Sequence, residues 1–259
     1  MYAEVKTSDN YAIPMSNDQS YLSKKNIPVK ERLIFALDVP SESEARKYVE
    51  KLGDSVSFYK LGLELFMSGN YYSLVEWLVK ENKKVFVDLK FFDVAETVGR
   101  AVSQLTGIGA SFATIHPVND EMIQGVVKVK KDLKILAVTV LTSLNRADLK
   151  DLGFECNVEA LVLSRARRAL ELGCDGVISS GLEAPKLRET LGDQFLIVAP
   201  GIRPVDNNVV DDQKRVVDVE EAFHNGADYI VVGRPIKNAP NPQKAAQDIQ
   251  RRISTLFQS

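Results

Sequence analysis

The chain has 259 residues, 45% of them hydrophobic and 26% charged, which is ordinary for a soluble globular protein. This length allows one large domain or two small ones. The formal net charge of −2 gives no reason to expect the basic domain typical of nucleic-acid binding, so no nucleic-acid partner is predicted.

Cysteine and histidine are too sparse for several other classes of protein. Cys156 and Cys174 cannot form a disulfide framework, and His116 and His224 do not stand in a ligand pattern, so no metal site is predicted. No apolar stretch approaches the roughly 20 residues of a membrane span. The N-terminus lacks the apolar core of a secretory signal. We therefore expect no membrane association and a reducing, cytoplasmic location.

The chain divides into two parts by periodicity. Residues 1–30 are polar with little periodicity, which predicts an N-terminal extension that lies on the domain or is detached from it. From Arg32 onward, short apolar runs alternate with helical stretches as far as the C-terminus. We therefore predict one domain over residues 31–259.

Eight apolar runs rich in Val, Ile and Phe predict the strands of this domain. The runs are residues 33–37, 58–61, 85–87, 112–115, 135–140, 176–178, 196–199 and 229–232. Continuous apolar strands separated by helices indicate a parallel sheet that is covered on both faces. Eight such units in about 225 residues favour a closed (β/α)8 TIM barrel over an open sheet.

Helix start signals follow several of the runs. They are Ser41 with Glu44, Asp218 with Glu221, and Asn241 with Pro242. The first two pairs are capping boxes, and the third places a cap residue before a proline in the first helical position. Because the strands of a parallel barrel all end on one face, the residues just after each run should meet there.

Charged residues stand at the ends of the first three predicted strands. Asp38 follows the first, Lys60 lies in the second, and Asp88 and Lys90 follow the third, with Asp93 close behind. Asp88 and Lys90 are two positions apart, so in a regular strand both point to the same side. Lys60 on the neighbouring strand can reach both. We predict an alternating row of Lys60, Asp88, Lys90 and Asp93 at the mouth of the barrel.

Two interpretations of this row remain open. It can be a structural network of ion pairs that closes one end of the barrel. It can also be catalytic, because a lysine held between carboxylates stays protonated and can act as a general acid. In the catalytic case, a fixed carboxylate beside a substrate carboxylate would disfavour the ground state, or the ammonium would stabilise a carbanion.

The loops after the last two strands predict a phosphate site. Residues 199–204 (Ala-Pro-Gly-Ile-Arg-Pro) follow strand seven, and residues 233–235 (Gly-Arg-Pro) follow strand eight. Barrels frequently bind phosphate there, with glycines that let backbone N–H groups approach and arginines that supply forked donors. The alternative is that the glycines only allow tight turns. The polar segment 205–215 after the first of these sites predicts a lid or a surface loop.

At this point the motifs resemble those of the orotidine 5′-phosphate decarboxylase family. The residues that carry the resemblance are Asp38, Lys60, Asp88-Leu89-Lys90-Phe91-Phe92-Asp93, Leu141-Thr142-Ser143, Pro200-Gly201-Ile202-Arg203-Pro204, Asp212-Gln213 and Val232-Gly233-Arg234-Pro235. They occur in family order from about Leu33 to the last helix. The resemblance implies decarboxylation of orotidine 5′-monophosphate (OMP) to uridine 5′-monophosphate (UMP) without a cofactor, as part of pyrimidine biosynthesis.

The resemblance also implies a role for each matching residue. Lys90 would protonate the pyrimidine carbon that CO2 leaves, Asp88 would lie against the departing carboxylate, and Lys60 would hold the network together. The implied catalytic residues are Lys60, Asp88, Lys90 and Asp93. The implied substrate-binding residues include Asp38 at the ribose hydroxyls, Thr142 at the pyrimidine and Gln213 between base and phosphate. Arg203, Gly233 and Arg234 would hold the phosphate, and Lys60, Thr97 and Pro200 complete the implied set.

In this family Asp93 and Thr97 reach into the partner's active site, so the resemblance implies a homodimer with composite sites. The chain departs from the family pattern in the segment after Lys90, at Phe92, Val94 and Ala95. Bacterial relatives often carry Phe-His-Asp-Ile-Pro after the lysine, where this chain has Phe91-Phe92-Asp93-Val94-Ala95. The charged row is intact despite the missing histidine and proline.

Two further functions remain open. One is a sugar-phosphate decarboxylase or aldolase of the same superfamily, which would normally require Mg2+. The other is a nucleotide-binding barrel without catalytic activity. The joint presence of Thr142, Gln213 and Arg203 argues against the first, and the intact charged row argues against the second.

Overall fold

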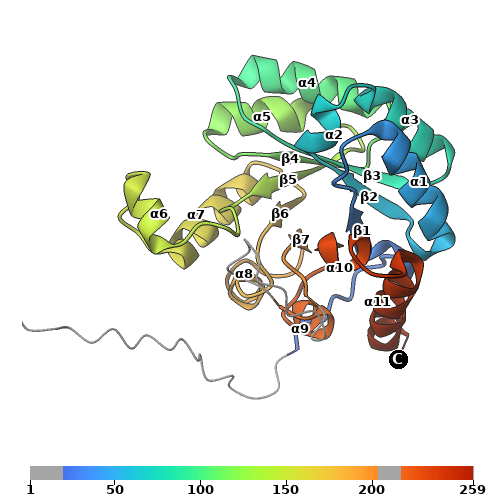
Figure 1. The fold of residues 1–259 in the computed structure, drawn as a ribbon. Helices are drawn as coiled ribbons and strands as arrows, with labels where there is room; N and C mark the ends of the chain where they lie inside the picture. The colour runs from blue at the N-terminus through green and yellow to red at the C-terminus, as the bar shows by residue number, and fades with distance from the viewer. Residues whose placement is uncertain (1–19, 204–216, 259) are drawn as a thin grey trace, which may run out of the picture.

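The computed structural model describes residues 20–203 and 217–258. In this part of the chain, eight parallel strands form a closed barrel in sequence order, and β1 pairs with β8 to complete it (Figure 1). The strands are β1 (Leu33–Ala36), β2 (Phe58–Leu61), β3 (Lys84–Phe91), β4 (Phe112–Ile115), β5 (Lys134–Val138), β6 (Gly176–Ile178), β7 (Leu196–Ala199) and β8 (Tyr229–Val232). The predicted (β/α)8 barrel is confirmed.

The apolar runs predicted most strand bounds, and β3 is the exception with a functional consequence. The bounds of β2, β4, β6, β7 and β8 are those predicted, whereas β1 and β5 end one and two residues early. β3 continues to Phe91, four residues past its apolar run, with a register shift against β4 between Val87 and Phe91. The charged residues Asp88 and Lys90 are therefore part of a strand.

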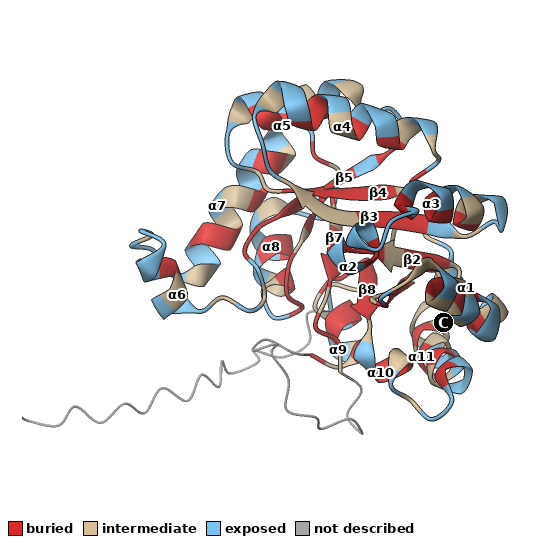
Figure 2. Cartoon of the chain, turned by 45° about the horizontal axis from the view of Figure 1, so that its top comes forward, coloured by how far each residue is buried: buried red, intermediate tan, exposed pale blue. Residues whose placement is uncertain are grey.

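Helices surround the barrel and turn their polar faces outward (Figures 1 and 2). They are α1 (Glu42–Leu52), α2 (Leu63–Met67), α3 (Tyr71–Lys80), α4 (Ala95–Gly107), α5 (Asp120–Val129), α6 (Arg146–Asp151), α7 (Val158–Glu171), α8 (Ala184–Leu191), α9 (Val219–His224), α10 (Arg234–Lys237) and α11 (Pro242–Phe257), with 3-10 turns η1 (Val29–Glu31) and η2 (Gly53–Ser55). Within the described residues, no helix is both long and apolar enough to cross a bilayer.

The predicted helix starts are confirmed. Ser41 accepts a hydrogen bond from the Glu44 amide at the start of α1. Asp218 forms a capping box at the start of α9. Asn241 caps α11, which has a proline in its first turn. These caps satisfy amides that a helix leaves without an internal partner.

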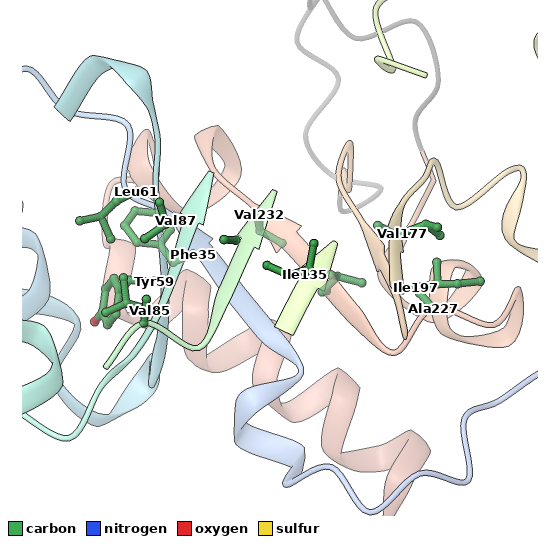
Figure 3. Packing of buried hydrophobic residues seen from close by; sticks show 14 of the residues in the cluster. Phe35, Tyr59, Leu61, Val85, Val87, Ile135, Val177, Ile197, Ala227 and Val232 are labelled. Carbon is green, nitrogen blue, oxygen red and sulfur yellow. The ribbon is translucent and has the colours of Figure 1, made fainter. Parts of the chain in front are cut away.

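The period-two alternation of the strands separates two apolar clusters. Outward-facing residues such as Phe35, Tyr59 and Val87 pack against the helices in the larger cluster, part of which Figure 3 draws. Inward-facing residues form a second cluster that fills the barrel: Ile34, Ala36, Phe58, Phe86, Phe112, Leu136, Val198, Tyr229 and Val231. Both clusters are buried, as the red strands in Figure 2 show.

Aromatic rings dominate the interior cluster. Phe112 lies with its ring centroid 4.9 Å from that of Phe58 and 5.1 Å from that of Tyr229. Phe86 is 6.0 Å from Phe112. Such tilted and edge-on pairs are favourable beyond their buried area. They give the barrel a solid floor, so that any cavity has to lie above it, towards the carboxyl ends of the strands.

The opposite end of the barrel is held by a buried carboxylate. Asp228, which is fully buried just before β8, accepts hydrogen bonds from Arg188 (2.7 Å) and from the Ile197 amide (2.9 Å). Ser23 and Lys25 also donate to it, at 2.5 and 3.0 Å. The last part of the predicted N-terminal extension thus contacts the barrel at the amino ends of the strands. The predicted charged row lies at the opposite, carboxyl ends.

Substitution of this carboxylate should destabilise the fold. We expect Asp228→Ala to lower the free energy of unfolding by about 3–5 kcal/mol, because it leaves the buried Arg188 guanidinium without its counter-charge. Urea denaturation measures the change. Asp248→Ala removes an exposed pair with Arg251 and should cost less than about 1 kcal/mol. Equal losses for the two variants would contradict a special role for Asp228.

Candidate active site

A polar layer lies directly above the aromatic floor. Four polar residues each follow an inward-facing core residue by two positions, in the pairs Ala36/Asp38, Phe58/Lys60, Phe86/Asp88 and Phe112/Thr114. Side chains two apart on a strand point to the same face. The alternation that places apolar residues in the barrel interior therefore directs the polar residue of each pair into the mouth of the barrel. Three of these polar residues lie on β2, β3 and β4, and Asp38 lies two positions after the end of β1.

The charged side chains form one continuous row. Lys60 Nζ lies 3.1 Å from Asp38 Oδ1 and 3.5 Å from Asp88 Oδ2. Lys90 Nζ lies 2.9 Å from Asp88 Oδ1. The observed order is thus Asp38, Lys60, Asp88, Lys90. The sequence analysis predicted that Asp93 would continue the row after Lys90. Within one chain, the row instead begins with Asp38 and ends at Lys90.

The central pair is largely shielded from water, with the Lys60 and Asp88 side chains 13% and 12% exposed. Burial alone would lower the pKa of Lys60, but Asp88 and Asp38 outweigh it and hold this pKa above its usual value. Burial alone would raise the pKa of Asp88, but Lys60, Lys90 and Thr114 hold it below its usual value. Both groups are therefore charged at neutral pH.

Lys90 reaches the row through an unusual backbone. Its φ is +50°, in the left-handed region that costs a non-glycine residue about 1–2 kcal/mol. The position lies within the register shift of β3, so the regular alternation assumed from the sequence does not hold there. Thr114 supports this conformation, because its Oγ1 accepts the Lys90 amide at 2.9 Å and donates to Asp88 at 3.0 Å.

The row lines one side of a cavity of about 300 Å3. Ala36, Phe86, Val138, Ile178 and Val231 form its apolar part. Its polar and loop residues are Asp38, Lys60, Asp88, Lys90, Leu141, Thr142, Ser143, Pro200, Gly201, Arg203, Gly233, Arg234 and Lys237, with Val140 beside them. Thr142, Pro200, Arg203, Gly233 and Arg234 are thus brought to the same cavity as the row, as the sequence predicted.

The end of the cavity formed after β7 and β8 suits an anion. Gly201 has a φ of +80°, which favours glycine, and Arg203 follows two residues later. At Gly233 a Cβ atom would lie 3.3 Å from that of Ala36, so a larger residue would press on β1. Arg234 begins α10 and lines the cavity. Barrels commonly bind phosphate with these two loops.

Two predicted residues do not line this cavity, and a third cannot be placed because it lies outside the described residues. Asp93 and Thr97 are exposed at the start of α4, where Asp93 Oδ1 accepts the Val94 amide at 2.6 Å. Gln213, like the predicted lid at 205–215, lies outside the described residues. In the described part of the chain, no group of three or more His, Cys, Asp or Glu residues could hold a metal ion.

Two polar residues of the site were missed in the sequence analysis. Thr114 is fully buried inside an apolar run, and only its place two residues after Phe112 signals that it faces the interior. Lys237 lines the cavity and donates from Nζ to the Asp38 carbonyl at 2.7 Å. It follows Arg234 by three positions, which places both on one side of a helical turn.

Comparison with known families identifies the fold and the motifs together. The sequence model of the "Orotidine 5'-phosphate decarboxylase / HUMPS family" matches residues 31–249. The chain belongs to this family. The family match thus agrees with the resemblance that the charged row and the glycine–arginine loops indicated in the sequence.

Relatives match over nearly the whole chain. An orotidine 5′-phosphate decarboxylase of Methylococcus capsulatus is 61% identical over 238 residues, covering 92% of this chain and 98% of the relative. One of Stenotrophomonas maltophilia is 47% identical, covering 91% and 99%. The crystal structure of the enzyme from Lactobacillus acidophilus superposes with a TM-score of 0.77 at 34% identity, covering 86% of this chain and 99% of that one.

The support from Thr114 can be tested by stability. We expect Thr114→Val to lower the free energy of unfolding by about 1–3 kcal/mol, because the Asp88 carboxylate loses a donor and the Lys90 amide loses an acceptor. Thr114→Ser keeps the hydroxyl and should lose only about 1 kcal/mol for the missing methyl group. Urea denaturation of both variants measures this. A valine variant at least as stable as the serine variant would contradict the role of the hydroxyl.

Proposed function

We propose that this chain decarboxylates OMP to UMP and CO2, in the cytoplasm and without a metal or organic cofactor. The observation that carries the proposal is the charged row Asp38–Lys60–Asp88–Lys90, with its shielded central pair, in a cavity that Arg203 and Arg234 also line. OMP has a carboxylate at one end and a phosphate at the other. The site offers charged groups for both.

The charge of the cavity fits such a ligand. The described residues that line it include five cationic side chains (Lys60, Lys90, Arg203, Arg234 and Lys237) and two carboxylates (Asp38 and Asp88). Among the described lining residues, cationic side chains therefore outnumber carboxylates. A phosphate monoester carries about −1.5 to −2 at pH 7 and the orotate carboxylate one more negative charge.

In the proposed reaction the bond between C6 of the pyrimidine and the carboxylate carbon breaks. The electron pair stays on C6, CO2 leaves, and C6 takes a proton from Lys90 Nζ. The Lys90 ammonium, 2.9 Å from Asp88, stabilises the negative charge that develops on C6 before it transfers the proton. Solvent then returns a proton to the amine.

Asp88 and Lys60 hold the reacting groups in place. Because the pKa of Asp88 is depressed, its carboxylate is ionised when the substrate carboxylate arrives beside it. The resulting repulsion disfavours the bound substrate and is relieved as CO2 leaves. Lys60 lies between Asp38 and Asp88 and prevents the two carboxylates from repelling each other.

The remaining assignments follow the family motifs residue by residue. Asp38 would bind the ribose hydroxyls and Thr142 the pyrimidine, while Gln213 would bridge base and phosphate. Pro200, Arg203, Gly233 and Arg234 would form the phosphate end. We also propose the predicted boundary at residue 31 between the N-terminal extension and the barrel domain, which agrees with the start of the family match.

We further propose a homodimer in which Asp93 and Thr97 complete the site of the partner. Both residues are exposed in a single chain. Asp93 lies between Phe92 and Val94, each 68% exposed. Apolar side chains that are exposed together in one patch with polar residues at its edge are typical of a surface that a partner covers.

A direct assay tests the proposed reaction. Purified protein should consume OMP in the presence of EDTA, followed by the loss of orotate absorbance. Activity abolished by EDTA would instead support the sugar-phosphate type of chemistry that requires Mg2+. Binding of UMP without turnover would support a nucleotide-binding barrel without catalytic activity.

Replacement of the proposed acid should stop turnover. We expect Lys90→Ala to lower kcat roughly 10^4-fold or more, because it removes both the proton donor and the nearby positive charge. Lys90→Arg keeps a charge beside Asp88 but holds its proton too firmly to donate it, so it should also be inactive while binding UMP better than the alanine variant. A rate within tenfold of the wild type in either variant would exclude Lys90 as the acid.

Mixed dimers test the composite site. Lys90→Ala and Asp93→Asn should each be inactive alone, whereas co-expression should restore about one quarter of the wild-type activity, because half the dimers then contain one intact site. This follows only if Asp93 acts in the partner's site. Co-expression of Lys90→Ala with Asp88→Asn, which affect the same site, is the matched control and should restore nothing. Equal results for both mixtures would contradict the composite site.

A further inference from the structure

Lys237 joins two parts of the cavity that the chain builds from opposite ends of its sequence. It is the last residue of α10, the turn that begins with Arg234 after β8. Its Nζ donates to the backbone carbonyl of Asp38 at 2.7 Å, just beyond β1. β1 and β8 are neighbours in the closed barrel, so this bond crosses the seam where the first and last strands meet.

The backbone of Lys237 is held as well. The Tyr48 hydroxyl donates to the Lys237 carbonyl at 3.3 Å, which links α10 to α1. The lysine side chain is half-buried and lines the cavity. An ammonium group has three donors, and the bond to Asp38 uses one of them, so the charge remains directed at the cavity.

Asp38 needs such support. Its side chain is 48% exposed, far more than those of Lys60 and Asp88, and its carboxylate bonds to Lys60 at 3.1 Å. That contact holds only one oxygen of the Asp38 carboxylate and does not fix the backbone that carries it. The bond from Lys237 fixes the Asp38 backbone instead, which defines the point from which the carboxylate projects.

We infer that Lys237 is a positioning residue that sets the place of the Asp38 carboxylate relative to the phosphate end of the cavity. The inference rests on the proposed function, in which Asp38 contacts the ribose and α10 the phosphate. Arg234 and Lys237 lie on one short helical turn, so a phosphate that contacts Arg234 and a ribose that contacts Asp38 are held at a fixed separation. Lys237 thereby selects for a ligand in which ribose and phosphate are adjacent.

Binding of UMP measures this role without requiring turnover. In the full chain, we expect Lys237→Met to raise the calorimetric Kd for UMP roughly tenfold, the size expected for loss of a hydrogen bond from a charged group. The kcat/KM for OMP should fall by at least as much, with part of the loss in kcat, since misplaced binding groups misalign the substrate. Lys237→Arg keeps a cationic donor and should recover most of the loss. Lys186→Met, which removes an exposed lysine paired with Glu189, is the matched control and should change neither value.

A double-mutant cycle separates positioning from a merely structural role. If Lys237 acts through Asp38, Lys237→Met should have little further effect in the Asp38→Ala background. A full tenfold effect in that background would overturn the inference, as would a Lys237→Met variant with wild-type Kd and kcat/KM. Thermal midpoints verify folding, and if the methionine variant does not fold, Lys237→Gln takes its place in the cycle.

The two proposals fail in different ways. Wild-type protein that binds UMP but does not turn over OMP would reject the decarboxylase reaction and leave the binding cycle for Lys237 decisive. Wild-type turnover combined with an additive cycle would reject the positioning role alone.

Discussion

The active site depends on one buried carboxylate that two ammonium groups share. Asp88 lies between Lys60 and Lys90, in contact with both, on top of the aromatic layer that fills the barrel. A charge in this place is costly unless it is paired and hydrogen-bonded, and Asp88 is both, because Thr114 donates to it as well. If Asp88 were neutral, the two lysines would repel each other and the row could not form.

The barrel supplies this arrangement by simple alternation, except at its most important residue. Asp38, Lys60, Asp88 and Thr114 face inward because each stands two positions after an inward-facing core residue. Lys90 instead adopts a left-handed conformation inside a register shift. Its strain of about 1–2 kcal/mol is offset by the Thr114 hydroxyl and by the Asp88 contact. Strain at a residue proposed to do chemistry is common where the surrounding structure fixes the geometry.

The sequence predicted the barrel and most of the site for a physical reason. Buried parallel strands need continuous apolar runs, so strands such as β2 and β4 were visible with their bounds. The end of β3 was hidden because its polar residues resemble a loop, and Thr114 was hidden because it lies within an apolar run. The contact of Lys237 with Asp38 could not be predicted from periodicity. It forms because β1 and β8, which are far apart in the sequence, pair in the closed barrel.

The phosphate end of the cavity and the charged row are proposed to act together on one substrate. In the proposed reaction, a phosphate held by Arg203 and Arg234 would be remote from the bond that breaks, yet its binding energy could be used to place the substrate carboxylate against Asp88. Binding energy at the phosphate end can act on the carboxylate only if the structure between the phosphate end and the charged row is rigid. In a flexible structure, the substrate would move away from Asp88 instead. The closed barrel provides this rigidity through the pairing of β8 with β1, and the bond from the Lys237 ammonium to the Asp38 backbone carbonyl adds a second link between the same two parts of the chain. In the proposed reaction, closure of the strands would therefore serve catalysis as well as stability.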